Sequence, residues 1–302
     1  MGKNTTGMRF MTRDAIKYLA IVAMTLDHIA YIFLEPQSLL YRLFLCIGTF
    51  TGPVMIYFLI EGYFYTHDVR GYAKRLLLFA LLSQMPFSLA IGGFFGNMLF
   101  TLLICLGVLY VHDHVVDGGV RNILYTLLFF ASLFTDWNFL SVPLVLFLRP
   151  AFHPAVPIVE RSADQYQNEE NILMKSQAKA QHFYIDPAEQ RRGMLKCVAY
   201  FIVVSCLTKG MIDGMTEVLG MVLGFVCIAC FYNGQQAKTH QKFHKYFFYI
   251  YYPVHLLVLW TLHAMYIFTN KGNLLPAPLD FLSFLTEQLI SGGVTLYLFR
   301  KQ

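Results

Sequence analysis

The sequence predicts an all-α fold: a polytopic membrane bundle of about ten transmembrane helices that forms a single domain over residues 1–302. Composition and chain pattern both support this prediction. Hydrophobic residues make up 57% of the chain and charged residues only 14%, whereas charged residues make up about 25% of a typical soluble domain. The mean hydropathy is +0.52. Apolar runs that approach the length needed to cross a bilayer, roughly 20 residues, recur along the whole chain.

These runs predict the individual helices in order. They lie at residues 15–34, 43–65, 73–91, 98–115, 121–135, 138–149, 195–209, 213–232, 244–268 and 279–299. The fifth, sixth and seventh runs are short for a membrane span, so about eight or nine spans is the alternative. Basic residues precede the first run and no small-residue cleavage site follows it. We therefore expect the first run to be a retained helix and not a signal peptide.

Positive charge predicts the orientation, because cytoplasmic loops of membrane proteins carry an excess of Lys and Arg. With ten spans and a cytosolic N-terminus, all of the 23 Lys and Arg residues except Arg42, Lys209 and Lys271 fall on the cytosolic side. Both termini are then cytosolic. The net charge of +5 is accounted for by this bias, so it indicates no nucleic-acid partner.

Residues 150–194 interrupt the series of apolar runs. Prolines at positions 150, 154 and 157 prevent a continuous helix at the start of this segment, and mixed charges follow. We interpret the segment as a cytosolic loop between two membrane halves. Within it, Tyr166 to Gln181 have the composition of a surface helix, but a mobile connector is the interpretation that loop length favours.

Two motifs that resemble metal or redox sites are interpreted as structural. Cys227-Ile-Ala-Cys230 lies inside an apolar run, where cysteine usually packs as a small core residue. His112-Asp113-His114 lies at a loop, and three such residues in succession are weak evidence for a zinc site. No Gly-rich phosphate loop, nucleophile elbow or HExxH motif is present. We expect no metal.

Ionisable side chains inside membrane runs are costly, and they are therefore the first candidates for function. Asp27 and His28 stand side by side in the first run, within MTLDHIAYIF. Neighbouring residues on a helix point about 100° apart, so Asp27 shares a face with small alanines and His28 points beside it. We interpret the pair as part of a catalytic site. The alternative is a structural role, in which the two side chains form hydrogen bonds that join helices.

Two further ionisable groups lie in later runs. Glu61 is near the cytosolic end of the second run, close to Arg70, Lys74 and Arg75. It either shapes a cytosolic entrance or forms a stabilising ion pair, and the basic cluster by itself is expected from the positive-inside bias. His255 follows Pro253, which removes a backbone hydrogen bond and bends a helix, as suits a cavity wall.

Taken as an ordered set, several motifs resemble the TraX family, membrane proteins named for the F-pilin acetylase. The motifs are KYLAIVAMTLDHIAYIF, PVMIYFLIEGYFYTHDVRGYAKRLLLFALLSQMPFSLA, NMLFTLLICLGVLYV, FYNGQQ and KYFFYIYYPVHLL. They cover both ends of the membrane core and leave out residues 150–194. The family is similar to transmembrane acyltransferases, so the resemblance implies a multi-pass protein of the bacterial inner membrane.

The resemblance further implies acetyl-CoA as the acyl donor. The acceptor is then a pilin-like protein N-terminus or a hydroxyl of a surface polymer. Acyl transfer needs a base, and His is suited to that role at neutral pH. We expect His28 to be the base, with His255 as second candidate, and Asp27 to raise the basicity of an imidazole or to fix the helix.

The resemblance also implies which residues bind acetyl-CoA and which stabilise the oxyanion that forms during transfer. The nucleotide end of acetyl-CoA is expected near Arg70, Lys74 and Arg75, with Glu61 at the entrance and the thioester reaching the depth of His28. Asn97 and Tyr252 are candidate donors to the oxyanion or to the acceptor.

The chain departs from the family pattern at one point. The family tends to carry an Arg in a pattern like GRxxFP, whereas this chain has Gly48-Thr49-Phe50-Thr51-Gly52-Pro53. The role of that Arg is then vacant or taken by Arg42. Two other classes of function stay open: a transporter that uses Asp27, Glu61 and His255 as a proton relay, and a non-catalytic membrane assembly protein. Against the transporter, no matching broken spans occur in the two halves.

Overall fold

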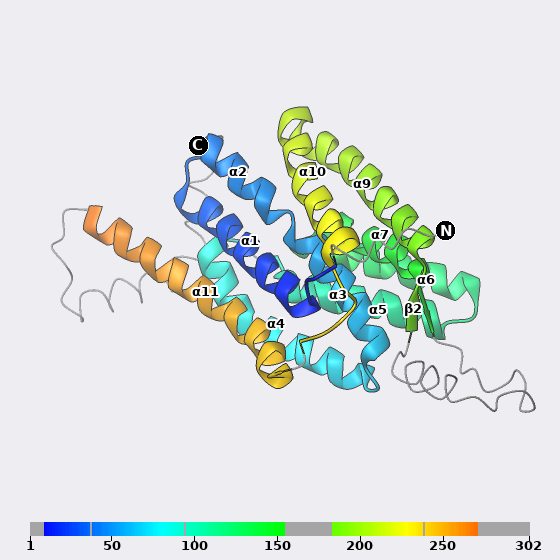
Figure 1. Cartoon of the computed structure of the whole chain (residues 1–302). Coiled ribbons are helices and arrows are strands. Elements are labelled where there is room, and N and C mark those ends of the chain that lie inside the picture. Colours follow the sequence, from blue (N-terminus) through cyan, green and yellow to red (C-terminus); the bar gives the residue numbers. More distant parts are fainter. Residues whose placement is uncertain (1–8, 37, 94, 155–182, 238, 271–302) are drawn as a thin grey trace, which may run out of the picture.

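The apolar runs form helices in the computed structural model, which describes residues 9–36, 38–93, 95–154, 183–237 and 239–270. The helices pack side by side as a bundle (Figure 1). They are α1 (Arg13–Phe33), α2 (Leu39–Gly48), α3 (Thr51–Tyr65), α4 (Val69–Ile91), α5 (Met98–His114), α6 (Gly118–Ser132), α7 (Asn138–Leu148), α9 (Pro187–Lys209), α10 (Met211–Val226) and α11 (Gln241–Asn270). A 3-10 turn η1 (Arg149–Ala151) follows α7, and a π-helical turn η3 (Cys227–Phe231) extends α10.

The described chain is all-α, apart from one short sheet, and has several helices suited to cross a membrane. Five segments are long and apolar enough: Arg13–Phe33, Leu39–Tyr65, Val69–Ile91, Met211–Phe231 and Gln241–Ile267. Shorter apolar helices lie at Met98–His114 and Asn138–Ala151. The run expected at 279–299 lies outside the described residues, so the count of ten spans and the orientation stay predictions.

The second span is interrupted, which the sequence analysis did not anticipate. α2 ends at Gly48 and α3 begins at Thr51. At the break, the Thr49 hydroxyl donates to the Leu45 carbonyl, and the Phe50 amide donates to Ile47 in a tightened last turn. Pro53 lies in the first turn of α3, where its missing amide hydrogen is tolerated. Because of this break, the C-terminal end of α2 and the N-terminal end of α3, with their polar backbone groups, lie inside the apolar bundle.

The predicted boundary of the loop at 150–194 is wrong at its C-terminal end. α9 begins at Pro187, because Asp186 caps it by accepting from the amides of Ala188 and Glu189 and proline is favoured at the first helical position. Before it, β1 (Phe152–Pro154) pairs antiparallel with β2 (Phe183–Ile185), with Phe152 opposite Ile185. Tyr166 to Gln181, for which the sequence left a connector or a surface helix open, lie outside the described residues.

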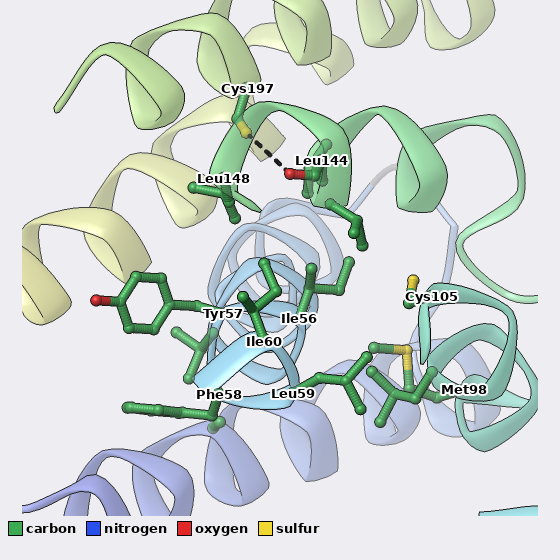
Figure 2. Close-up of a cluster of buried hydrophobic side chains, with 14 of the residues drawn as sticks. Ile56, Tyr57, Phe58, Leu59, Ile60, Met98, Cys105, Leu144, Leu148 and Cys197 are labelled. Atoms are coloured by element: carbon green, nitrogen blue, oxygen red, sulfur yellow. Dashed lines mark hydrogen bonds between the residues drawn. The ribbon is translucent and has the colours of Figure 1, made fainter. Parts of the chain in front are cut away.

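α3 forms the centre of the hydrophobic core. Its side chains point outward to several neighbouring helices (Figure 2), and Ile56, Tyr57 and Ile60 are fully buried. Cys197 of α9 lies against the α7 carbonyl of Leu144, with its Sγ 3.8 Å from that oxygen. Cys105, Cys197 and Cys227 are buried as core residues, whereas Cys46, Cys206 and Cys230 are partly exposed.

Two glycines of α10 allow it to approach the α2–α3 break closely. A Cβ atom at Gly220 would lie 1.8 Å from the carbonyl oxygen of Cys46, and one at Gly224 would lie 3.2 Å from that of Phe50. Because these glycines are four residues apart, they share one face of α10. Small residues at this spacing let two backbones pack closely where no hydrophobic driving force acts between helices.

Candidate active site

A cavity of about 450 Å³ lies between α1, α3, α4, α5 and α11. One end is lined by basic residues near the start of α1, α4 and α11. The middle is apolar, with Phe58, Leu59 and Leu99 among its walls. The other end is lined by Met24, Thr51, Met98 and Tyr252. The cavity therefore combines a charged mouth with an apolar shaft that reaches into the bundle.

The mouth carries excess positive charge from Arg13, Lys17, Arg75 and Lys242, against one lining acid, Asp14. Among the described residues, neither Lys17, Arg75 nor Lys242 takes part in an ion pair. The Nε atoms of Arg13 and Arg75 are buried and have no hydrogen-bond partner within the described part of the chain. Buried donors without partners are costly. An anion at the mouth would satisfy them.

Beyond the deep end of the cavity, two histidines from opposite ends of the sequence meet. The Nδ1 atom of His28 in α1 lies 2.8 Å from the Nε2 atom of His255 in α11. The two rings stack at 5.0 Å with an interplanar angle of 15°. The Tyr252 ring, which lines the cavity, lies 6.4 Å from the His28 ring and 5.6 Å from the His255 ring. The histidine pair thus lies directly behind Tyr252.

The hydrogen bonds define where the protons of a neutral histidine pair reside. The Nδ1 atom of His255 lies 2.9 Å from the Tyr251 carbonyl, which only accepts, so Nδ1 carries the hydrogen. Its Nε2 atom is then an acceptor and receives the hydrogen on Nδ1 of His28. In the neutral His28 ring, this leaves Nε2 with its lone pair. A free lone pair on an imidazole nitrogen is what a general base requires.

Comparison with known proteins identifies the family of this chain. The TraX protein family model matches residues 12–163 and 117–263, which together include every element that forms the cavity and the histidine pair. The chain belongs to the TraX family. The resemblance noted from the sequence motifs is therefore confirmed, and the match extends over most of the chain.

A curated relative of this TraX-family chain is described as "Probable fimbrial assembly protein FimC, serogroup H1" from Dichelobacter nodosus. The two are 34% identical over 145 residues. The match covers 44% of this chain and 59% of the relative, so it spans less than two thirds of the relative's length. No solved structure matches the chain.

Asp27 of this TraX-family chain lies against α2. A Cβ atom at Gly48 would lie 2.3 Å from Oδ1 of Asp27, so the carboxyl group occupies the space that a side chain at position 48 would need. Asp27 also interacts electrostatically with Asp136, Glu217 and Lys209. Asp27 therefore faces the α2–α3 break, and His255 bonds to His28.

Arg42, the residue considered as a substitute for the missing family Arg, pairs with Asp213 of α10 at 3.2 Å. Thr49, which occupies the position of that Arg, bonds back to its own helix at Leu45. The break in the second span is thus held without a cation at position 49. Asp136, in the loop between α6 and α7, lies on the same side of the bundle, and burial raises its pKa to about 6 while the Lys209 ammonium opposes that shift.

Of the remaining residues predicted to bind the donor, some line the cavity and others do not. Arg75 and Tyr252 line it, whereas Arg70 and Lys74 are exposed and do not. Glu61 is buried next to the mouth, where it accepts a short hydrogen bond from Tyr232 and lies 3.9 Å from Arg13. The Glu61 carboxylate therefore positions the Arg13 guanidinium at the mouth through this ion pair.

Asn97 is fully buried and caps α5. Its side-chain amide donates to the Ala80 carbonyl at 2.8 Å, and its side-chain oxygen accepts from the Leu99 amide at 3.0 Å. The neighbouring Met98 amide donates to the Tyr252 hydroxyl at 3.4 Å. Asn97 therefore positions the start of α5 at the deep end of the cavity.

Sequence reasoning missed three of the four cations at the mouth: Arg13, Lys17 and Lys242. From the sequence alone, these three were counted only among the basic residues of the cytosolic side. The signal that links Lys17 to His28 is helical periodicity, since Lys17, Met24 and His28 lie seven and four residues apart and share one face of α1. Among the described residues, no group of His, Cys, Asp and Glu side chains is arranged to hold a metal.

Proposed function

We propose that this chain is a membrane-embedded acetyltransferase that transfers the acetyl group of cytosolic acetyl-CoA to an amine or hydroxyl acceptor, such as a pilin-like N-terminus or a surface polymer. The proposal includes a bacterial inner-membrane location with both termini cytosolic. One observation carries it: a cavity with a basic mouth and an apolar shaft ends at Tyr252, whose ring contacts the buried His28 and His255 rings. In this pair, the Nε2 atom of the neutral His28 ring keeps its lone pair. Membership in the TraX family supports the same class.

The residues present suit an acyl-CoA donor. Among the described residues, Lys17, Arg75 and Lys242 form no ion pair. The phosphates of the donor would supply the missing anionic partners, because both Lys and Arg are common phosphate ligands. From Lys17 to His28 the distance along α1 is about 16 Å, at 1.5 Å per residue. The apolar shaft between them would accommodate a long, thin pantetheine arm and bring the thioester close to His28.

The chain's own residues then have distinct roles. His28 accepts the proton of the acceptor through Nε2, and His255 holds the His28 ring in the required tautomer. The Tyr252 hydroxyl accepts from the Met98 amide, and its own hydrogen stays available for a developing oxyanion. The apolar walls lower the local dielectric, which strengthens that interaction. Asp27 supports the helix that carries His28 through its contact at Gly48.

Transfer of labelled acetyl groups by the purified protein tests the proposal. We expect detergent-solubilised protein with radiolabelled acetyl-CoA to label a pilin or surface-polymer fraction from the source cell, and acetyl-CoA to raise the thermal unfolding temperature. If acetyl-CoA neither stabilises the protein nor donates label to either fraction, the proposal is refuted.

Removing the cations at the mouth should weaken donor binding. For Lys17→Gln and Arg75→Gln, we expect KM for acetyl-CoA to rise about tenfold, the effect of losing a hydrogen bond to a charged group, with little change in kcat. Lys196→Gln is the matched control, because Lys196 is exposed on α9 and does not line the cavity. Initial-rate kinetics over a range of acetyl-CoA concentrations measures both parameters. Equal KM values in all three variants would place the donor elsewhere.

A non-catalytic role in pilus assembly is the second candidate, and the name of the curated relative favours it. In that case the polar residues only join helices, and the His28 to His255 contact is a clamp. The two candidates differ in the acetyl-CoA tests above, because an assembly protein has no reason to bind or consume the thioester.

A further inference from the structure

A second pocket, of about 290 Å³, lies at the other end of α1, between α1, α2, α9 and α10. It contains two ion pairs. Arg42 of α2 pairs with Asp213 of α10, and Lys209 of α9 pairs with Glu217 of α10. Hydroxyl groups complete the lining, from Tyr31, Tyr41 and Thr216. A pocket with this many charged and polar groups in an otherwise apolar bundle indicates a polar ligand.

One face of α1 connects this pocket with the donor cavity. Lys17 and Met24 line the cavity, His28 follows four residues after Met24, and Tyr31 lines the second pocket three residues later. Residues at these spacings lie on one side of a helix. His28 lines neither cavity, but along α1 it lies between Met24 and Tyr31, about one helical turn from a lining residue of each.

The Lys209 to Glu217 pair indicates what the second pocket recognises. Glu217 is only 7% exposed, and both its oxygens contact the Lys209 ammonium, at 2.7 and 2.8 Å. Glu217 is the carboxylate in contact with Lys209, and Asp27 and Asp136 interact with the same ammonium electrostatically. The Lys209 side chain is 46% exposed and long. A ligand ammonium can therefore take its place on Glu217 while Lys209 moves into solvent.

We propose that this pocket is the acceptor site and that Glu217 binds a primary ammonium group there. The proposal rests on the proposed acetyltransferase function, and its new element is the location of an amine acceptor in this pocket. In the transfer, the amine nitrogen forms a bond to the acetyl carbon and the carbon–sulfur bond of the thioester breaks. The ammonium loses two protons: one goes by way of His28 to the leaving sulfur, which departs as the CoA thiol, and the other is released to solvent.

Cysteine labelling tests the site without depending on catalysis. Thr216→Cys places a thiol in the acceptor pocket, and Thr66→Cys places one in the donor cavity as the matched control. The parent chain, with its own six cysteines, is measured alongside as the background. We expect glycinamide, a primary ammonium, to slow the labelling of Thr216→Cys by a maleimide several-fold and to leave Thr66→Cys unchanged. N-acetylglycinamide, which lacks the ammonium, should protect neither thiol.

The Glu217→Gln variant keeps the size of the side chain and removes its charge. Combined with Thr216→Cys, it should abolish protection by glycinamide. In the transfer assay, it should raise KM for an amine acceptor about tenfold or more, as expected when one partner of a buried charge pair is lost, and leave KM for acetyl-CoA unchanged. Equal protection by both amides, or protection that survives in Glu217→Gln, would overturn the acceptor site.

The result also separates the two proposals. If glycinamide protects Thr216→Cys but no acetyl transfer is detected, the ammonium site is supported and the proposed acetyltransferase function is refuted. Acetyl transfer to an amine with an unchanged acceptor KM in Glu217→Gln would retain the acetyltransferase and refute this site.

Discussion

Replacement of His28 by Ala is expected to lower acetyl transfer by about 10²–10⁴-fold, the usual contribution of a general base. The variant loses the Nε2 lone pair and also the donor to His255, so its stability has to be followed separately. His28→Asn addresses this point, because its side-chain amide can still donate to His255 while no basic nitrogen remains. We expect both variants to lose kcat to a similar extent and His28→Asn to keep more of the wild-type thermal stability.

The matched control for the histidine variants is His112→Ala. His112 bonds to the Tyr125 hydroxyl at 2.8 Å and does not line the donor cavity. We expect it to retain wild-type kcat. Initial rates with labelled acetyl-CoA, together with thermal unfolding of each purified variant, provide the comparison. If His28→Asn turns over at the wild-type rate, His28 is not the base and the histidine pair is a clamp.

Replacement of Gly220 by Val is expected to be the most destabilising single change. A Cβ atom at this position would lie 1.8 Å from a backbone oxygen of α2, so a helix has to move and not only a side chain. Overpacking of this kind typically costs about 1–3 kcal/mol. α2 also carries Gly48, against which Asp27 packs, so the displacement would reach the helix that holds His28.

The Gly220→Val protein should show a lower yield of monodisperse protein on size exclusion and a lower unfolding temperature. Gly118→Ala is the matched control, since no atom lies within 4 Å of a Cβ built at that position and alanine favours a helix over glycine. An unfolding temperature for Gly220→Val equal to that of the control would show that α10 and α2 are not tightly packed.

Part of the candidate site could be found from sequence because burial of ionisable groups in apolar runs is a local signal. Asp27, His28, Glu61 and His255 stand out in this way. The signal does not reveal partners. Asp27 was expected either to raise the basicity of an imidazole or to fix the helix that carries His28, and the structure places it against Gly48. The imidazole of His28 instead donates a hydrogen bond to His255, 227 residues away.

The cations at the cavity mouth also show that a local sequence signal does not reveal which residues come together in the fold. Arg70, Lys74 and Arg75 form one cluster in the sequence, yet the positive-inside bias explains such clusters without a ligand. Only Arg75 of these three lines the cavity, next to Arg13, Lys17 and Lys242 from two other helices. Which charges converge depends on how the helices rotate and pack, and that is decided by contacts such as the glycines of α10.

The sequence by itself determined that this is a multi-pass helical membrane protein of the TraX family, because composition, run length and ordered motifs are properties of the chain alone. The tertiary structure decided the pairing of α1 with α11, the break in the second span, and the two cavities on either side of His28. These features are contacts between residues far apart in the chain. Their geometry follows from close packing between helices, and no local pattern encodes it.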